Sequence, residues 1–352
     1  MLSLTPSELG ELLVTLPAER TPFIWGPPGI GKSALVREAA ERLGMDCVTL
    51  LGTQIAPEDL IGVPRIRALG DEGGRHVTEF CPPSAILRSE PFLLFIDELN
   101  SAVPDVQKAF YSLILDRRLG DYVLPTGSRV VGAGNRVEDR ALVRPMATAL
   151  ANRMVHVALE PDADSWLGWG ATHGVHPLVL AFVRARPDRL SELPPTDATP
   201  TYPTPRAWHM LSDALASVGE RLWPAVAAGS VGDRAGAEWA AFAKRAVEAP
   251  PLEAIAAGTA TLPRDPELLY FLGASSLARL SSQRAEDGEI AAKVVAALGG
   301  ASKEVAVWVV DAALARRRKT AASSAFEDQV RQSGSQVLVD VLRLGRFARE
   351  GS

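Results

Sequence analysis

Short apolar runs alternate with helical stretches between residues 22 and 159. Apolar runs without polar alternation are typical of strands that are buried on both faces of a sheet. Alternation of such strands with helices predicts a parallel five-stranded sheet covered by helices, and therefore an α/β fold. The predicted strands are 23–25, 47–51, 92–96, 130–134 and 154–159.

The N-terminal residues predict a helix that precedes this core. Thr5-Pro-Ser-Glu8 has the spacing of a capping box, with proline at the first helical position. We expect this helix to end near Leu16.

After the last predicted strand, helical segments replace the alternation. Residues 193–205 contain five prolines, which are too many for regular structure and predict an extended crossing segment. A helix is expected over 206–215, and alanine-rich amphipathic helices follow, one of which places Ile290, Val294 and Leu298 on a single face. The expected domains are an α/β core at 1–160, a helical lid at 161–215 and a helical accessory region at 216–352.

The most informative segment lies between the first predicted strand and the next helix. Residues 26–33 read Gly-Pro-Pro-Gly-Ile-Gly-Lys-Ser, a complete G-x-x-x-x-G-K-S/T phosphate loop. Its glycines let backbone N–H groups approach phosphate oxygens, and the following helix adds its partial positive charge. Lys32 is expected to reach the β- and γ-phosphates, and Ser33 to ligate Mg²⁺. The predicted nucleotide-binding residues are Gly26, Pro27, Pro28, Gly29, Ile30, Gly31, Lys32, Ser33, Ala34 and Asp97.

A second nucleotide signature follows the apolar run 92–96, which ends in Asp97 and Glu98. The carboxyl end of a buried parallel strand opens into the ligand crevice of such sheets. There Asp97 is expected to hold Mg²⁺, directly or through water, and Glu98 to polarise the water that attacks the phosphate.

Two further polar residues stand next to later strands. Asn135 follows the apolar strand 130–134 and is expected to orient the attacking water and to sense the γ-phosphate. Arg153 stands between a helix and the last strand, a position that would point towards the nucleotide of a neighbouring subunit. A guanidinium supplied across an interface stabilises the charge that builds on the γ-phosphate. The alternative for Arg153 is an ordinary surface or salt-bridged arginine.

Composition narrows the class of partner. The net charge is −5 and the isoelectric point is about 5.7, a balance that disfavours binding to nucleic acid phosphates. The two cysteines form no metal pattern and no disulfide framework, which favours a reducing compartment. No apolar stretch is long enough to span a membrane and the N-terminus lacks secretory features, so we expect a cytoplasmic protein.

Together these motifs resemble those of the AAA+ ATPases, and more closely those of the MoxR group in the helix-2-insert clade. In that comparison residues 26–33 correspond to Walker A, 93–100 to Walker B, and Asn135 to the sensor-1 asparagine. Arg153 matches the arginine-finger position, and Arg206 matches the sensor-2 arginine, which would serve either its own or the adjacent nucleotide. The resemblance implies a P-loop NTPase core followed by a helical lid.

Two segments resemble the hairpin insertions of this clade. Residues 57–90, with a predicted tip at 69–74, look like a hairpin that interrupts a helix. Residues 118–129 resemble the hairpin that precedes sensor 1. The resemblance implies that these hairpins face a substrate or partner in a ring, and the alternative is that they only pack against the core.

The resemblance also implies a function. A finger that acts across an interface is idle in a monomer, so the family comparison implies a homo-oligomeric ring, a hexamer, that hydrolyses ATP with Mg²⁺. MoxR-group proteins resemble chaperone-like remodellers that act on a protein client together with a von Willebrand factor A (VWA) domain partner.

Two other functions remain open at this stage. A nucleic-acid-associated motor, such as the McrB-type GTPases of the same clade, is disfavoured by the acidic balance. A small-molecule kinase would explain the phosphate loop but would leave Asn135, Arg153 and the second helical domain without a role.

Overall fold

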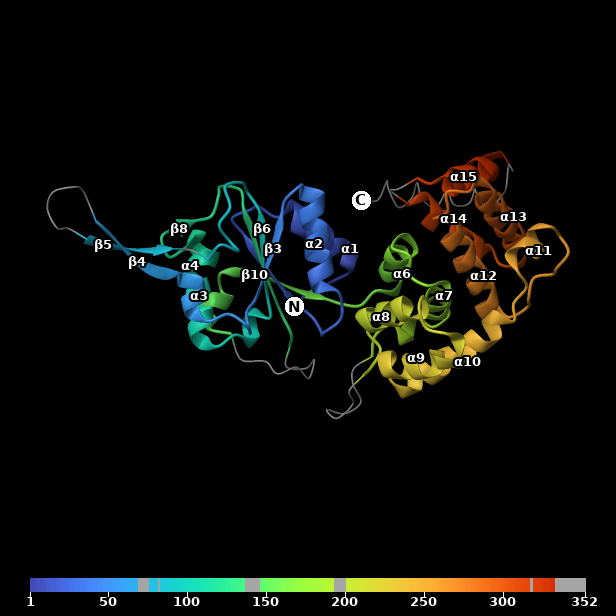
Figure 1. Ribbon diagram of the computed structural model, residues 1–352, viewed down its shortest axis with the longest axis horizontal. Helices are drawn as coiled ribbons and strands as arrows, with labels where there is room; N and C mark the ends of the chain where they lie inside the picture. Colours follow the sequence, from blue (N-terminus) through green and yellow to red (C-terminus); the bar gives the residue numbers. More distant parts are fainter. Residues whose placement is uncertain (69–75, 82, 137–145, 193–200, 317–318, 333–352) are drawn as a thin grey trace. The chain divides into compact units, whose positions relative to one another are not determined.

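The computed structural model divides into two compact units, Met1–Pro161 and Asp162–Ser352 (Figure 1). Each unit has its own hydrophobic cores. The residues that the structure describes are 1–68, 76–81, 83–136, 146–192, 201–316 and 319–332. Among the helices of these ranges, none combines the length and the apolar character needed to cross a bilayer.

The first unit is built on a fully parallel sheet with the strand order β1-β10-β2-β9-β6-β3. The predicted number of five strands is wrong by one, because β1 (Ser3–Leu4) adds an edge strand next to the end of β10. Two residues are too few to produce a periodic pattern, so the sequence carried no signal for β1. The other strands are those predicted: β2 (Thr21–Trp25), β3 (Cys47–Leu51), β6 (Leu93–Asp97), β9 (Arg129–Gly134) and β10 (Met154–Leu159).

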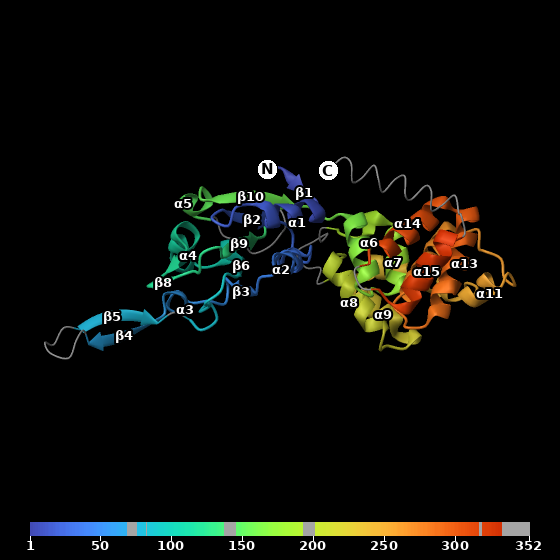
Figure 2. The same cartoon turned by 90° about the horizontal axis from the view of Figure 1, so that it is seen from above.

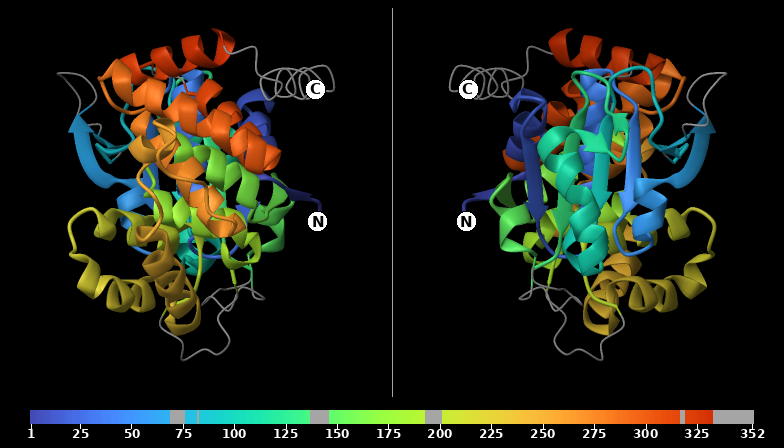
Figure 3. Two further views of the ribbon diagram at one scale, coloured as in Figure 1. Left: turned by 90° about the vertical axis from the view of Figure 1, so that its right-hand side faces the viewer. Right: turned by 90° about the vertical axis from the view of Figure 1, so that its left-hand side faces the viewer.

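Helices cover both faces of this sheet (Figures 1 and 3). One face is covered by α1 (Pro6–Thr15) and α2 (Lys32–Leu43), and the other by α3 (Pro57–Ile61), α4 (Pro104–Asp116) and α5 (Thr148–Ala151). Successive residues of a strand point to opposite faces. Leu93 and Phe95 therefore pack under α1 and α2, whereas Leu94 and Ile96 pack under the other three helices.

The predicted N-terminal helix is confirmed as α1, with both hydrogen bonds of the capping box. Thr5 Oγ1 accepts from the backbone N–H of Glu8 at 3.3 Å, and Glu8 Oε2 accepts from that of Thr5 at 2.8 Å. At the other end of α1, the guanidinium of Arg129 donates to the carbonyls of Leu13 and Val14, at 3.3 and 3.2 Å. A cation at this end complements the helix dipole. Arg129 therefore anchors the start of β9 to the end of α1.

Two hairpins belong to this unit. The first pairs β4 (Val63–Ala68) with β5 (His76–Cys81) and projects from the core (Figure 2). The second pairs β7 (Arg118–Leu119) with β8 (Tyr122–Val123). Both predicted hairpins are present, and the predicted tip at 69–74 lies outside the described residues. The backbone N–H of Phe80 donates to Asp121 Oδ2 at 3.2 Å, which links the two hairpins.

From the family resemblance we expected the first hairpin to interrupt a helix. The structure shows that it does not. It follows the short helix α3, but residues 83–90 after it form turns and no second helical half. Pro83 and Pro91 bound this stretch, and the residue before a proline avoids helical dihedral angles. Too few residues are left there to form a stable helix.

The described part of the second unit is helical. The predicted shared face of Ile290, Val294 and Leu298 is confirmed, because all three pack into one core. Trp208 and Trp239 are fully buried in the other core, which joins residues on both sides of the expected boundary at 215/216. That boundary stays a prediction, and residues 193–200 of the predicted proline-rich segment lie outside the described residues. The helices are α6 (Ala163–Thr172), α7 (Pro177–Ala185), α8 (Pro205–Leu215), α9 (Trp223–Val231), α10 (Asp233–Val247), α11 (Leu252–Ala256), α12 (Pro266–Arg279), α13 (Ala285–Ala301), α14 (Lys303–Leu314) and α15 (Ala321–Gln332).

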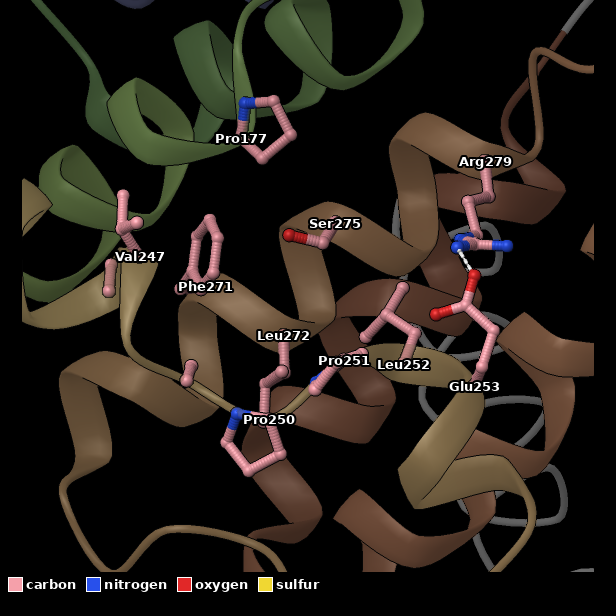
Figure 4. Close-up of a pocket in the computed structure, with 12 residues that line it drawn as sticks. Pro177, Val247, Pro250, Pro251, Leu252, Glu253, Phe271, Leu272, Ser275 and Arg279 are labelled. Carbon is pink, nitrogen blue, oxygen red and sulfur yellow. Dashed lines mark hydrogen bonds and ion pairs between the residues drawn. The ribbon is translucent and has the colours of Figure 1, made fainter. Parts of the chain in front are cut away.

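A pocket of about 330 Å³ lies in this second unit (Figure 4). Its lining is mainly apolar and includes Pro250 and Phe271. Arg279 at its edge is already paired with Glu253 and, at 2.9 Å, with Asp287. The two charged side chains of this lining, Glu253 and Arg279, are therefore already paired.

Candidate nucleotide-binding site

The carboxyl ends of adjacent strands meet at one edge of the first unit's sheet. Trp25 at the end of β2 is paired with Gly134 at the end of β9, and β6 lies next to β9. Residues 26–33 follow β2, Asp97 is the last residue of β6 and is followed by Glu98, and Asn135 follows β9. The structure thus brings these predicted site residues together within one subunit.

The phosphate loop, residues 26–33, joins β2 to α2. Gly29 and Gly31 adopt φ angles of 78° and 108°, a left-handed region that residues with a side chain rarely enter. Gly31 is the N-cap of α2, so the first N–H groups of the helix are directed towards the loop. This geometry is the one that binds anions at a helix N-terminus.

The side chain of Lys32 lies within this loop and is only 8% exposed. Its Nζ donates to the carbonyl of Gly26 at 2.6 Å and to Oδ1 of Asn135 at 2.8 Å. The ammonium thus connects the phosphate loop with the end of β9. Phosphate oxygens, which carry charge, are stronger acceptors for the same ammonium than these neutral oxygens.

Ser33 and Asp97 supply the oxygen atoms of the site. Ser33 Oγ, in the first turn of α2, donates to Asp97 Oδ2, at the end of β6, over 2.8 Å. Hydroxyl and carboxylate oxygens are the ligands that Mg²⁺ prefers in proteins. The donor set at this point therefore fits a Mg²⁺ ion.

Glu98 has an unusual backbone and a partner that sequence reasoning missed. Its φ of 53° is left-handed, and its N–H donates to Asp97 Oδ1 at 3.0 Å. Non-glycine residues in this region are concentrated at functional sites. Thr53 Oγ1 donates to Glu98 Oε2 at 2.7 Å and so holds the carboxylate. The pairing of Leu51 with Asp97 brings the residues after both strands together and so accounts for this contact.

Asn100 is a second residue that sequence reasoning missed. It is 1% exposed, and its Nδ2 donates to the backbone carbonyl of Asn135 at 2.9 Å. Its Oδ1 is buried next to Gly134, where it occupies the space that a Cβ atom would need. An asparagine after a strand is equally typical of a turn, so its burial could not be predicted from the sequence. Asn100 therefore positions the backbone from which Asn135 extends.

We expect Gly134→Ala to destabilise the first unit. The added Cβ would overlap Asn100 Oδ1 and lie 2.8 Å from Cζ of Phe23, which is fully buried. Overpacking of this kind costs about 1–3 kcal/mol. Gly10→Ala in α1 is the matched control, because its Cβ would meet only the end of the flexible Arg42 side chain, at 3.3 Å. In thermal unfolding, the melting temperature should be clearly lower for Gly134→Ala and unchanged for Gly10→Ala. Equal melting temperatures of the two variants would contradict this packing.

Arg153 lies at the opposite edge of the sheet, where the amino ends of the strands meet. It directly precedes β10, whose first residue, Met154, is paired with Thr21, the first residue of β2. The phosphate loop follows the last residue of β2. The length of that strand, about 16 Å at 3.3 Å per residue, therefore separates the start of β10 from the loop. Within one subunit the structure does not bring Arg153 to the nucleotide loop.

Arg206 belongs to the second unit. It is exposed in the first turn of α8, whose N-cap Thr204 accepts a hydrogen bond from the backbone N–H of Ala207 at 3.0 Å. The helix expected after the proline-rich segment is thus confirmed. The sensor role of Arg206 stays a prediction.

A model of a known protein family matches most of the first unit. Residues 22–154 match the family model of the AAA domain, dynein-related subfamily. The matched range contains the phosphate loop, the carboxylate pair, Asn135 and Arg153, and it ends at the first residue of β10. The predicted α/β P-loop fold of the AAA type is therefore confirmed, and the match implies nucleotide binding.

Solved structures with related folds are distant. They include a proposed ATPase from Cytophaga hutchinsonii, at 22% identity and a TM-score of 0.35, and a RuvB mutant from Thermotoga maritima, at 16% and 0.39. The first similarity covers 47% of this chain and 50% of that protein, and the second covers 71% and 81%. The chain thus spans half the length of the Cytophaga protein. These similarities carry no functional argument, and no curated protein matches the sequence significantly.

Proposed function

We propose that this protein is an Mg²⁺-dependent ATPase whose complete site forms between subunits of a homo-oligomeric ring. One observation carries the proposal: a phosphate loop, two carboxylates and an asparagine share one sheet edge, while Arg153 stands at the other edge. A site assembled from both edges needs two copies of the chain. We expect six, as in the family that the sequence resembles.

Each residue at the loop edge has a proposed role. Lys32 binds the β- and γ-phosphates of ATP, and Asn135, which shares a hydrogen bond with Lys32, senses the γ-phosphate. Ser33 and Asp97 would hold Mg²⁺, which supplies positive charge against the phosphate oxygens when it is bound. Glu98 accepts a proton from the attacking water, and its contact with Thr53 keeps the carboxylate in a defined place before it does so.

Arg153 is proposed to complete the site of the neighbouring subunit. A guanidinium placed against the γ-phosphate stabilises charge that develops only in the transition state. The separation of about 16 Å between the two sheet edges supports a role in the neighbouring subunit and not in its own.

The client and partner are proposed at a coarser level. We propose a MoxR-type remodeller of protein clients that works in the cytoplasm with a VWA-domain protein. The linked hairpins support this proposal, because β4 is exposed along its whole length and presents Val63 and Ile66 to solvent, at 71% and 74% exposure. Exposed apolar side chains on a projecting hairpin are typical of an interaction surface.

The ring is tested by measuring hydrolysis against protein concentration. Activity per subunit should rise with concentration, and light scattering in ATP and Mg²⁺ should show a species near six subunits. A fully active monomer would exclude the ring and the trans role of Arg153.

Nucleotide binding is tested with Lys32→Ala, which should weaken ATP binding by about 10²-fold or more, because hydrogen bonds from a charged group contribute roughly 1.5–3 kcal/mol each. Calorimetry measures this affinity. Lys108→Ala removes an exposed lysine of α4 that pairs with Asp105 at 2.9 Å, and it should bind ATP like the unmodified protein. Equal affinity of Lys32→Ala and Lys108→Ala would remove Lys32 from the site.

A further inference from the structure

Helix α4 connects the segment that carries Glu98 to the helix that precedes Arg153. Near the start of α4, the side chain of Gln107 is only 4% exposed. Its Nε2 donates to the carbonyl of Ala102 at 3.1 Å, and its Oε1 accepts from the backbone N–H of Ala147 at 3.4 Å. Ala102 follows the turn after Glu98, and Ala147 is the N-cap of α5. One buried amide therefore holds both chain segments.

One turn further along α4, Tyr111 holds Arg153 itself. Residues four apart lie on the same side of a helix, so Gln107 and Tyr111 both face α5. The Cζ atom of Arg153 lies 4.5 Å from the centroid of the Tyr111 ring, and the Tyr111 hydroxyl accepts a hydrogen bond from Arg153 Nη1. The same Nη1 donates to the carbonyl of Ala149 at 2.6 Å. An exposed and otherwise flexible cation is thus fixed by a ring, a hydroxyl and a carbonyl.

We propose that Tyr111 is a positioning residue for Arg153. Tyr111 holds the guanidinium where it would reach the nucleotide of the neighbouring subunit. Helix α4 also connects this position to the segment that carries Glu98 of the same subunit. The inference rests on the proposed function, because Arg153 needs a neighbouring site to act upon. Tyr111 acts through Arg153 and not on the nucleotide.

The physical reason is preorganisation. A catalytic cation that is already ordered loses less conformational entropy when it engages the transition state, and a misplacement of about 1 Å can cost up to roughly 10²-fold in rate. Without the tyrosine ring, the carbonyl of Ala149 is the contact of Arg153 that is left among the described residues, and the side chain is expected to sample other rotamers. The rate should fall although nucleotide binding in the same subunit is unchanged.

The test uses mixed rings of two inactive variants. A Lys32→Ala subunit has an intact Arg153 and serves as a finger donor, whereas an Arg153→Ala subunit has an intact nucleotide loop and serves as an acceptor. Hydrolysis in the mixture reports only the interfaces at which the two meet. Tyr111→Leu is then added either to the donor or to the acceptor, and co-assembly is followed by light scattering.

If Tyr111 acts through Arg153, Tyr111→Leu in the donor should lower the recovered hydrolysis by roughly 10-fold, without a change in KM for ATP. The same change in the acceptor, which has no Arg153 to hold, should have no effect. Tyr111→Phe in the donor keeps the ring and should retain an intermediate rate, while Lys108→Ala on the exposed side of α4 should match the unmodified donor.

The other possible outcomes would each overturn the proposed role of Tyr111. An equal effect in donor and acceptor would assign Tyr111 to the general stability of the subunit, and no effect in the donor would show that Arg153 needs no holder. Either result overturns the inference and leaves the proposed function intact. If the two parent variants co-assemble but recover no hydrolysis at all, Arg153 does not act in trans, and the proposed function falls together with the role of Tyr111.

Discussion

Arg153→Ala is expected to lower ATP hydrolysis by about 10³-fold or more while ATP affinity and ring size stay nearly unchanged, because the loss of an arginine finger removes contacts made only in the transition state. Steady-state hydrolysis, calorimetry and light scattering measure the three quantities. Arg20→Ala is the matched control, because Arg20 is exposed at the same sheet edge, directly before β2. Its hydrolysis rate should stay within about two-fold of the unmodified protein.

Mixing the Lys32→Ala and Arg153→Ala subunits in equal amounts makes this prediction quantitative. An interface is active only if the first variant supplies the arginine and the second supplies the nucleotide loop. Random assembly gives this arrangement at about one quarter of the interfaces of a closed ring. Recovered hydrolysis of about one quarter of the rate of the unmodified protein supports a trans role of Arg153. A strong loss for Arg20→Ala as well would indicate that the charge of this edge matters and not the particular arginine.

Glu98→Gln is expected to keep ATP binding and to lower hydrolysis by roughly 10²–10⁴-fold, the usual contribution of a positioned general base. Glutamine keeps the size of the side chain and can still accept from Thr53, but it cannot take a proton from water. Binding and single-turnover hydrolysis separate the two effects. Glu41→Gln, an exposed position on α2, controls for the change in net charge and should behave like the unmodified protein. Turnover of Glu98→Gln equal to that control would show that another group is the base.

The sequence predicted much of the sheet and of the loop edge, for a physical reason. Strands that are buried on both faces are almost entirely apolar, so the polar residues directly after them stand out. Asp97 ends one such strand and Asn135 follows another, and the register places the ends of β2 and β9 side by side. The phosphate loop was predictable because the backbone angles of Gly29 and Gly31 require glycine whatever packs around them.

Other contacts of the site could not be predicted from the sequence. Thr53 lies in a turn, Asn100 in a short 3₁₀ helix and Tyr111 in α4. Their residue types are common there, and no local sequence pattern distinguishes them from neighbours without a role. Their contacts depend on which chain segments the fold brings together, over separations of 35 to 45 residues. Only the three-dimensional arrangement supplies that information. The missed strand β1 has a similar cause, because its pairing with β10 joins the two ends of the unit.

The placement of the phosphate loop and Arg153 at opposite sheet edges also constrains the symmetry of the proposed assembly. A two-fold axis would require one patch on each copy to contain both the loop and Arg153, whereas the proposed ring sets the loop edge of one copy against the arginine edge of the next. Such a contact is heterologous, and it leaves one unused edge at each end of an open chain of subunits. A closed ring has as many complete sites as subunits, but an open assembly always has one fewer. Closure alone would therefore add a catalytic site without any change in sequence or conformation within a subunit.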